Sequence, residues 1–158
     1  MNDDLGLSTF NITWGNIKSG TEAITTNITN SGNIPDVILC DQADAIAASL
    51  VALGLGVPLA VAHTNPRVNN MILDCLPKLS NPIRSGEYVQ ATRPKIVIIS
   101  TLIDDKRNVD DLVTHYTKHG HAVTTMCIYS RKTVINPSDY HWVLLSRYTH
   151  YTFPWNNK

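Results

Sequence analysis

The sequence predicts an α/β fold, with a central, mainly parallel sheet flanked by helices. Short apolar runs without polar alternation recur along the chain, as in strands that are covered on both faces. Segments with helical spacing of apolar residues separate these runs, and strand–helix–strand repeats of this kind form right-handed crossover units. At 158 residues, of which 43% are hydrophobic, the chain has the size and composition of one domain.

The expected elements follow from these patterns. The apolar runs predict strands at 36–40, 58–63, 95–100, 122–129 and 140–145, of which 95–100 is β-branched almost throughout. Helical spacing predicts helices at 14–29, 44–53 and 108–119. Gly54 and Gly56 are predicted to end the second of these helices and Gly120 the third, and Asn108 is the predicted N-cap of the third.

One stretch, residues 64–94, breaks the alternation. It holds Pro66, Pro77, Pro82 and Gly86 and shows no sustained period. We predict an irregular excursion there, a small hood above the sheet, within a single domain that covers residues 1–158. Residues 131–158 are predicted to supply the C-terminal strand and tail.

Charge and cysteine content narrow the expected partners and location. The formal net charge is zero and charged residues make up 16%, so the chain is not suited to neutralising the phosphates of a nucleic acid. So weak a charge provides little repulsion between copies, which favours a homodimer. The sequence shows no membrane span or secretory signal. Three widely spaced cysteines are typical of reduced thiols, so the expected location is the cytoplasm.

Several short motifs occur in a recognisable order. They are Phe10-Asn11-Ile12-Thr13-Trp14, Pro35-Asp36-Val37-Ile38-Leu39, Leu53-Gly54-Leu55-Gly56-Val57-Pro58, His119-Gly120-His121, Pro137-Ser138-Asp139-Tyr140 and Phe153-Pro154-Trp155. Outside 64–93, their order and spacing resemble the type I phosphoribosyltransferases, especially the purine-salvage branch of hypoxanthine or xanthine–guanine type. The resemblance implies this family's fold and its reaction, in which a nitrogenous base displaces pyrophosphate from phosphoribosyl pyrophosphate with the help of magnesium.

The resemblance also places a ribose and phosphate site after the third strand. In the family, two adjacent acidic residues hold the ribose hydroxyls, and a Thr/Gly-rich turn wraps the 5′-phosphate with backbone N–H groups. Here the acidic pair falls on Ser100 and Thr101, and the turn falls on Asp104-Asp105-Lys106-Arg107-Asn108. Side chains obstruct the close approach that glycines allow, and carboxylates repel a phosphate. The loop is therefore predicted to be degenerate.

A shifted register is the alternative for this loop. Asp104 and Asp105 would then be the acidic pair, while Lys106 and Arg107 would hold an anion by charge. This register requires an unusually long strand, and the residues up to 110 still offer no glycine turn. A solvated loop is the interpretation that we favour.

The resemblance implies two further sites. The family contacts pyrophosphate with a loop after the first strand, which here is Asp41-Gln42-Ala43-Asp44. The two carboxylates of this loop, Asp41 and Asp44, would repel pyrophosphate unless a metal ion were bound between them. Asp44 is also predicted to be the N-cap of the next helix.

For the purine base, two pairs of residues are the candidates. Arg131 or Lys132 lies near the position of the lysine that contacts the purine in the family. His150 or Tyr151 lies near the position of the aromatic residue that stacks on the base. The alternative is that the aromatic residues of the tail pack it onto the domain, which is the interpretation that we favour.

The predicted function is therefore binding without phosphoribosyl transfer. The ligand would be a nucleotide or another anionic small molecule at the C-terminal edge of the sheet, or a protein partner. An active, divergent purine phosphoribosyltransferase that uses Asp104, Asp105 and magnesium is the alternative, and a structural or assembly role is the third. His115 and His119 share a helix face, but no further ligand motif accompanies them, so no metal centre is predicted.

Overall fold

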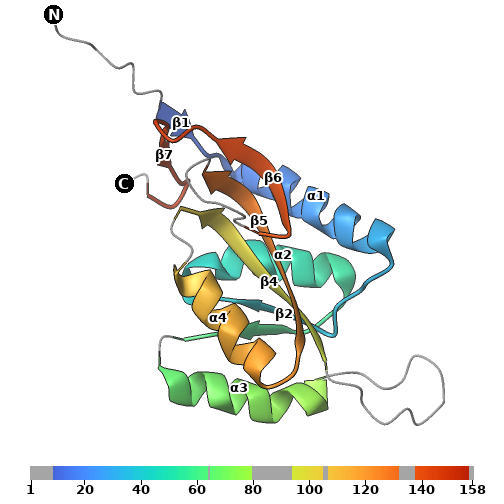
Figure 1. Cartoon of the computed structure of the whole chain (residues 1–158). Helices are drawn as coiled ribbons and strands as arrows, with labels where there is room; N and C mark the ends of the chain where they lie inside the picture. The colour runs from blue at the N-terminus through green and yellow to red at the C-terminus, as the bar shows by residue number, and fades with distance from the viewer. Residues whose placement is uncertain (1–8, 64, 80–93, 105–106, 132–137, 157–158) are drawn as a thin grey trace, which may run out of the picture.

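The computed structural model describes residues 9–63, 65–79, 94–104, 107–131 and 138–156. Within these residues the main sheet has five strands, all parallel, in the order β3-β2-β4-β5-β6 (Figure 1). The strands are β2 (Val37–Cys40), β3 (Leu59–Val61), β4 (Lys95–Ile103), β5 (Ala122–Arg131) and β6 (Tyr140–Leu145). The prediction of an α/β fold around a mainly parallel sheet is confirmed.

Helices cover both faces of this sheet. They are α1 (Trp14–Ser31), α2 (Ala45–Leu55), α3 (Pro66–Leu79) and α4 (Arg107–Lys118), and a short 3-10 turn, η1 (Gln42–Asp44), precedes α2. One buried cluster joins α1 and α2 to the sheet and includes Ile17, Ile24 and Val51. A second joins α3 and α4 to the opposite face and includes Leu76 and Tyr116.

The two covered faces explain the continuous apolar runs of the sequence. All four residues of β2 are buried, and so are seven of the nine residues of β4. In a sheet with helices on both sides, each side chain of a central strand points into a core. Hydrophobicity therefore does not alternate along these strands.

The first turn of α1 is closed by a capping box. The Thr13 hydroxyl accepts a hydrogen bond from the backbone N–H of Asn16 (3.2 Å), and the Thr13 N–H donates to Asn16 Oδ1 (2.9 Å). Two backbone donors that have no partner within the helix are satisfied in this way. At the other end, Gly32 adopts φ 69°, the left-handed conformation that ends many helices.

A Thr13→Ala variant tests the contribution of this capping box. We expect it to lower the free energy of unfolding by about 1 kcal/mol, because the Asn16 N–H loses its acceptor. Urea denaturation followed by circular dichroism measures the difference. Thr26→Ala, at an exposed position in the middle of α1, is the control and should change the free energy by less than about 0.5 kcal/mol. Equal losses in the two variants would contradict the role of the cap.

Helix α3 is the main departure from the predicted organisation. The prediction of an irregular segment at 64–94 is wrong for residues 66–79, which form this helix, and residues 80–93 lie outside the described residues. Pro66 is the first helical residue, where a missing N–H is tolerated. Leu76 is buried, and Ile72 and Leu73 pack against the same cluster, so the segment has an apolar face that its prolines obscured.

Some boundaries also differ from the prediction in ways that bear on the site. Helix α4 begins at Arg107, so Asn108 lies inside its first turn and is not the N-cap that was predicted. Strand β4 continues to Ile103, three residues beyond the predicted end. No described helix has the length and apolarity needed to cross a membrane.

A second, two-stranded sheet joins the two ends of the described chain. Strand β1 (Thr9–Asn11) pairs in parallel with β7 (His150–Thr152), with Phe10 opposite Tyr151. Beyond β7, Phe153 stacks on Trp155 at 4.7 Å between ring centroids, and Trp155 lies 5.7 Å from Trp14. The tail aromatics thus pack against the start of α1. This small sheet lies at the end of the molecule toward which β4 and β5 point (Figure 1).

Candidate functional site at the C-terminal edge of the sheet

Parallel strands bring the predicted site residues to one edge. The segment 41–44 follows β2, Asp104 follows β4 directly, and Arg131 is the last residue of β5. Tyr151 reaches the same edge from β7. Ligands of open α/β sheets bind at this edge, beyond the carboxyl ends of the strands. Asp105, Lys106 and Lys132 lie outside the described residues, as do the side chains of Arg107 and Asn108.

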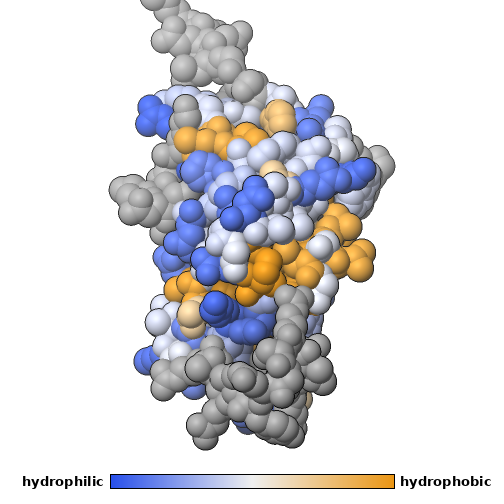
Figure 2. Space-filling model, turned by 90° about the vertical axis from the view of Figure 1, so that its right-hand side faces the viewer, coloured by the Kyte–Doolittle hydropathy of each residue, from blue (hydrophilic) through white to orange (hydrophobic). Residues whose placement is uncertain are grey.

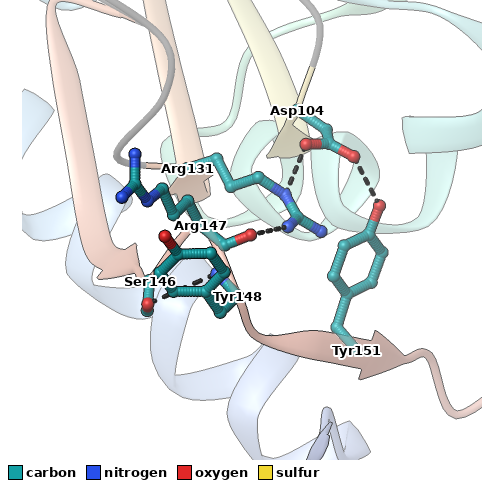
Figure 3. Close-up of polar contacts among 6 residues, drawn as sticks. All are labelled: Asp104, Arg131, Ser146, Arg147, Tyr148 and Tyr151. Atoms are coloured by element: carbon teal, nitrogen blue, oxygen red, sulfur yellow. Dashed lines mark hydrogen bonds and ion pairs between the residues drawn. The ribbon is translucent and has the colours of Figure 1, made fainter. Parts of the chain in front are cut away.

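Asp104, Arg131 and Tyr151 form one polar group, here called the edge cluster (Figure 3). Arg131 Nε is ion-paired with Asp104 Oδ1, and the Tyr151 hydroxyl donates to Asp104 Oδ2 at 3.0 Å. Arg131 Nη1 donates to the backbone carbonyl of Arg147, also at 3.0 Å. Both oxygens of the Asp104 carboxylate therefore have partners within the protein.

The edge cluster is half-open to solvent. The Arg131 side chain is 16% exposed and that of Asp104 is 45% exposed, so a ligand can reach the carboxylate more readily than the guanidinium. The Arg131 guanidinium carbon lies 5.0 Å from the centre of the Tyr151 ring, in cation–π geometry. One face of this ring is thus covered. A base can stack on Tyr151 only from the other face, or after Arg131 has moved.

Burial and the contact with Asp104 also affect the hydroxyl of Tyr151. Burial is the larger cause of a raised pKa for this phenol, and its hydrogen bond to Asp104 raises the pKa further. Tyr151 therefore remains protonated at neutral pH and keeps its role as a donor to Asp104. Phe153 contacts the Tyr151 ring edge-on, at 5.6 Å between centroids.

Ser100 and Thr101, where the resemblance places the ribose-binding pair, lie inside the sheet. Their exposed fractions are 5% and 2%. The backbone N–H of Thr101 donates to Asp44 Oδ1 at 2.7 Å. Strand β2 pairs with β4 only as far as Leu39 opposite Ile98, so the Asp44 carboxylate supplies an acceptor beyond the end of that pairing.

The Asp44 carboxyl has a perturbed pKa. Burial raises its pKa to about 6; the Thr101 N–H opposes that shift, and the charge of Asp41 adds to it. The Asp41 side chain caps the short turn η1, because its Oδ1 accepts hydrogen bonds from the backbone N–H groups of Ala43 (2.8 Å) and Asp44 (3.1 Å). Asp44 occupies the N-cap position of α2, as predicted, but its carboxylate makes no capping hydrogen bond and accepts from the Thr101 N–H instead.

Two thiols lie beside this loop. Cys40 and Cys127 are buried, and desolvation raises the pKa of Cys40 to about 12 and that of Cys127 to about 11. Both thiols are therefore protonated near neutral pH. In the part of the chain that is described, no group of three or more His, Cys, Asp or Glu residues is arranged to hold a metal ion. His119 Nδ1 lies 2.7 Å from the His115 carbonyl at the end of α4.

The length of β4 removes one objection to the shifted register. That register required an unusually long strand before Asp104, and β4 does run for nine residues to Ile103. The sequence pointed to Asp104, Arg131 and Tyr151 separately, but not to their mutual contacts. The carbonyl of Arg147 and the bond from Thr101 to Asp44 were not anticipated, since neither leaves a signal in residue type or spacing. His150 is exposed on β7.

No family model matches the sequence, and the search of curated proteins gives no match. Among solved structures, the chain is similar to a purine phosphoribosyltransferase from Pyrococcus horikoshii, with a TM-score of 0.66 and 18% identity over 95% of each chain. The chain has the phosphoribosyltransferase fold.

Two more structures share the phosphoribosyltransferase fold of this chain. The xanthine-guanine-hypoxanthine phosphoribosyltransferase of Helicobacter pylori has a TM-score of 0.69 and 5% identity, over 94% of this chain and 93% of that one. A hypothetical protein from Neisseria gonorrhoeae with bound ppGpp has a TM-score of 0.62 and 12% identity, over 94% and 89%. At such identities the similarity shows the fold alone.

Proposed function

We propose that this phosphoribosyltransferase-fold protein binds a nucleotide or a related anionic small molecule at the C-terminal edge of its sheet, without transferring phosphoribosyl groups. The burial of Ser100 and Thr101 carries the second part of this proposal, the absence of phosphoribosyl transfer. Side chains that hold ribose hydroxyls must be accessible, and these two are not. They also lack the carboxylates that the resemblance calls for, so the edge is poorly equipped for the reaction.

The charges at the edge support a ligand that combines a base with a phosphate. Asp41, Asp44 and Asp104 alone would repel an anion. In the sequence, however, Lys106 and Arg107 follow Asp104 and Asp105, and Lys132 follows Arg131, so charges of both signs occur there. The ppGpp in the Neisseria gonorrhoeae structure supports a phosphorylated purine as the ligand class.

The test measures the melting temperature of the protein, first with guanosine monophosphate and then with phosphoribosyl pyrophosphate and magnesium. In the second set of samples, purines are added and the release of pyrophosphate is followed. A ligand that binds the folded state raises the melting temperature with its concentration. We expect guanosine monophosphate to stabilise the protein, and we expect no release of pyrophosphate. Absence of any shift with either compound would overturn the proposed binding.

Two variants locate the binding. Arg131→Ala should abolish the stabilisation, because Arg131 is the cation of the edge cluster. Lys118→Ala is the matched control, since it also removes one positive charge but lies at the last residue of α4, before β5 begins at the opposite edge of the sheet. Equal effects of the two variants would show that the ligand binds by general charge and not at this edge.

An active, divergent purine phosphoribosyltransferase is the second candidate, favoured by one observation. Asp104 directly follows the long β4 and is 45% exposed, so its carboxylate can be reached from solvent. Such an enzyme would release pyrophosphate in a magnesium-dependent manner. Asp104→Asn, which keeps an acceptor for Tyr151, would then reduce the release strongly.

A further inference from the structure

Three histidines occur together where α4 ends and β5 begins, at the edge of the sheet opposite to the edge cluster. His115 lies in the last turn of α4, His119 follows this helix directly, and His121 immediately precedes β5. The chain has six histidines, so half of them lie in this one segment. His115 and His119 are here called the histidine pair.

The rings of the histidine pair lie side by side. Their centroids are 5.0 Å apart, with 47° between the ring planes. Two imidazoles that bind one tetrahedral ion, each through a nitrogen about 2.0–2.1 Å from the metal, have centroids about 5 Å apart. The i, i+4 spacing that brings the rings together is also the spacing of the two zinc-binding histidines in helical metal sites. The separation of the pair therefore suits two ligands of the same ion.

The Nε2 atom of His115 lacks a partner. It is buried and makes no hydrogen bond within the protein. Buried polar atoms are almost always paired, because an unpaired one loses its hydration without compensation. A metal ion bound to this nitrogen would supply the missing partner. His119 is exposed, so its side chain can move to admit the ion.

The His119 ring is oriented by the backbone of α4. Its Nδ1 lies 2.7 Å from the carbonyl oxygen of His115, and a carbonyl only accepts, so Nδ1 carries the proton and Nε2 keeps a lone pair. The backbone N–H of His119, which would bond to this carbonyl in a continuing helix, bonds to the carbonyl of Tyr116 instead (3.2 Å). Metal-binding histidines are commonly held in this way, through the ring N–H that is directed away from the metal.

The electrostatics of the histidine pair favour transition metals over hard cations. Burial lowers the pKa of His115, and the positive charges of His119 and Lys118 lower it further. Positive charge thus acts on the pair, so an ion must be held by nitrogen lone pairs and not by charge. Imidazole nitrogen is a usual ligand of Zn²⁺, Cu²⁺ and Ni²⁺, whereas Mg²⁺ and Ca²⁺ prefer oxygen.

We propose that the histidine pair binds one divalent transition-metal ion of the Zn²⁺ type through the two Nε2 atoms. In the described part of the chain no third ligand joins the pair, so water fills the remaining positions. His121 contacts the Tyr116 ring instead, at 6.3 Å between centroids. The ion would connect the last turn of α4 to the residue that follows it and so stabilise this end of the helix. This inference is independent of the proposed ligand, since the pair includes no residue of the edge cluster.

Isothermal titration calorimetry of the full chain with Zn²⁺ tests the proposal. We expect one ion per chain, and the same result when excess Mg²⁺ is present. Because the ion binds the folded helix, it should also raise the melting temperature. At a Zn²⁺ concentration about five times the dissociation constant the rise should be roughly 2–4 °C.

Self-association of the chain would release heat without involving the histidine pair. Figure 2 shows a band of hydrophobic residues across the middle of one side of the molecule, and such a surface favours association. The titration is therefore carried out at two protein concentrations. Binding to the pair gives the same dissociation constant at both, and a constant that changes with protein concentration would contradict it.

His119→Ala locates the ion. Loss of a group that only orients a metal ligand typically costs about 10–100-fold in metal affinity, so loss of a ligand should weaken Zn²⁺ binding at least as much. His141→Ala is the matched control, because it also removes one exposed histidine, on β6, and should leave the affinity unchanged. A wild-type chain that binds no Zn²⁺ would overturn the proposal, as would Zn²⁺ binding that His119→Ala leaves unchanged.

Discussion

A Gly20→Ala variant is expected to unfold at a clearly lower urea concentration than the wild type, with a loss of about 1–3 kcal/mol in the free energy of unfolding. A Cβ atom at Gly20 would lie 2.4 Å from Ile128 Cγ2 and 3.0 Å from Trp142 Cε3. Ile128 is fully buried in the cluster beneath α1, so it has no space into which to move. The added methyl group must therefore push α1 away from β5 and β6.

Gly15→Ala is the control for this prediction. Gly15 lies in the same helix, is exposed, and would place its Cβ at an ordinary distance of 3.6 Å from Thr13 Oγ1. Alanine is favoured over glycine in a helix by about 0.5–1 kcal/mol, so this variant should be as stable as the wild type or slightly more so. A loss that is equal in both variants would mean that helix propensity, and not the contact with Ile128, governs position 20.

The second large effect is expected at Asp44, as a dependence of stability on pH. The pKa of this carboxyl is raised from its ordinary value of 3.8 to about 6 in the folded protein. Between these values the folded state binds more protons than the unfolded state, so unfolding becomes easier as the pH rises. The stabilisation from protonated Asp44 is present below pH 3.8 and is lost as the pH rises through about 6.

Asp44→Asn isolates this effect. The amide oxygen can still accept from the Thr101 N–H, but it carries no charge. At pH 7 we expect the variant to be more stable than the wild type, by an amount on the order of 1–3 kcal/mol. The difference between the two proteins should vanish near pH 4. Urea denaturation at a series of pH values measures it, and a difference that does not vary with pH would rule out Asp44 as the titrating group.

Asp44→Ala separates the charge from the hydrogen bond. This variant also lacks the charge, but it leaves the N–H of Thr101 without the acceptor that the wild type provides. A buried donor without a partner costs about 1–3 kcal/mol, so Asp44→Ala should be less stable than Asp44→Asn at every pH. Equal stability of these two variants would indicate that Thr101 finds another acceptor.

The sheet could be predicted from the sequence because its strands are covered on both faces. Because β4 is buried on both faces, it needs an apolar residue at nearly every position, and such a run can be recognised in the sequence alone. Helix α3 was missed because Pro66 and Pro77 are read as breaks, although a proline at the first helical position is compatible with a helix. Strands β1 and β7 are three residues long, like β3, but each contains a single aromatic residue between polar ones, so no apolar run marks them.

The site was less predictable than the fold for a different reason. Arg131 and Tyr151 were candidates for a base site because of their place in the chain, but their contacts with Asp104 depend on how three separate strand ends meet. The bond between Asp44 and Thr101 joins residues 57 positions apart. Whether a carboxylate is exposed for a ligand or used within the protein depends on such contacts, and residue type alone does not reveal them.

Because β1 pairs with β7, the edge cluster can be completed only late in the synthesis of the chain. Tyr151 belongs to the last strand, and β7 is held in place by residues 9–11, the first described strand of the chain. During synthesis β7 is the last of the described strands to leave the ribosome, so it cannot pair with β1 until residues 150–152 have been made. Until then the edge cluster lacks Tyr151, whose hydroxyl donates to Asp104 in the complete fold.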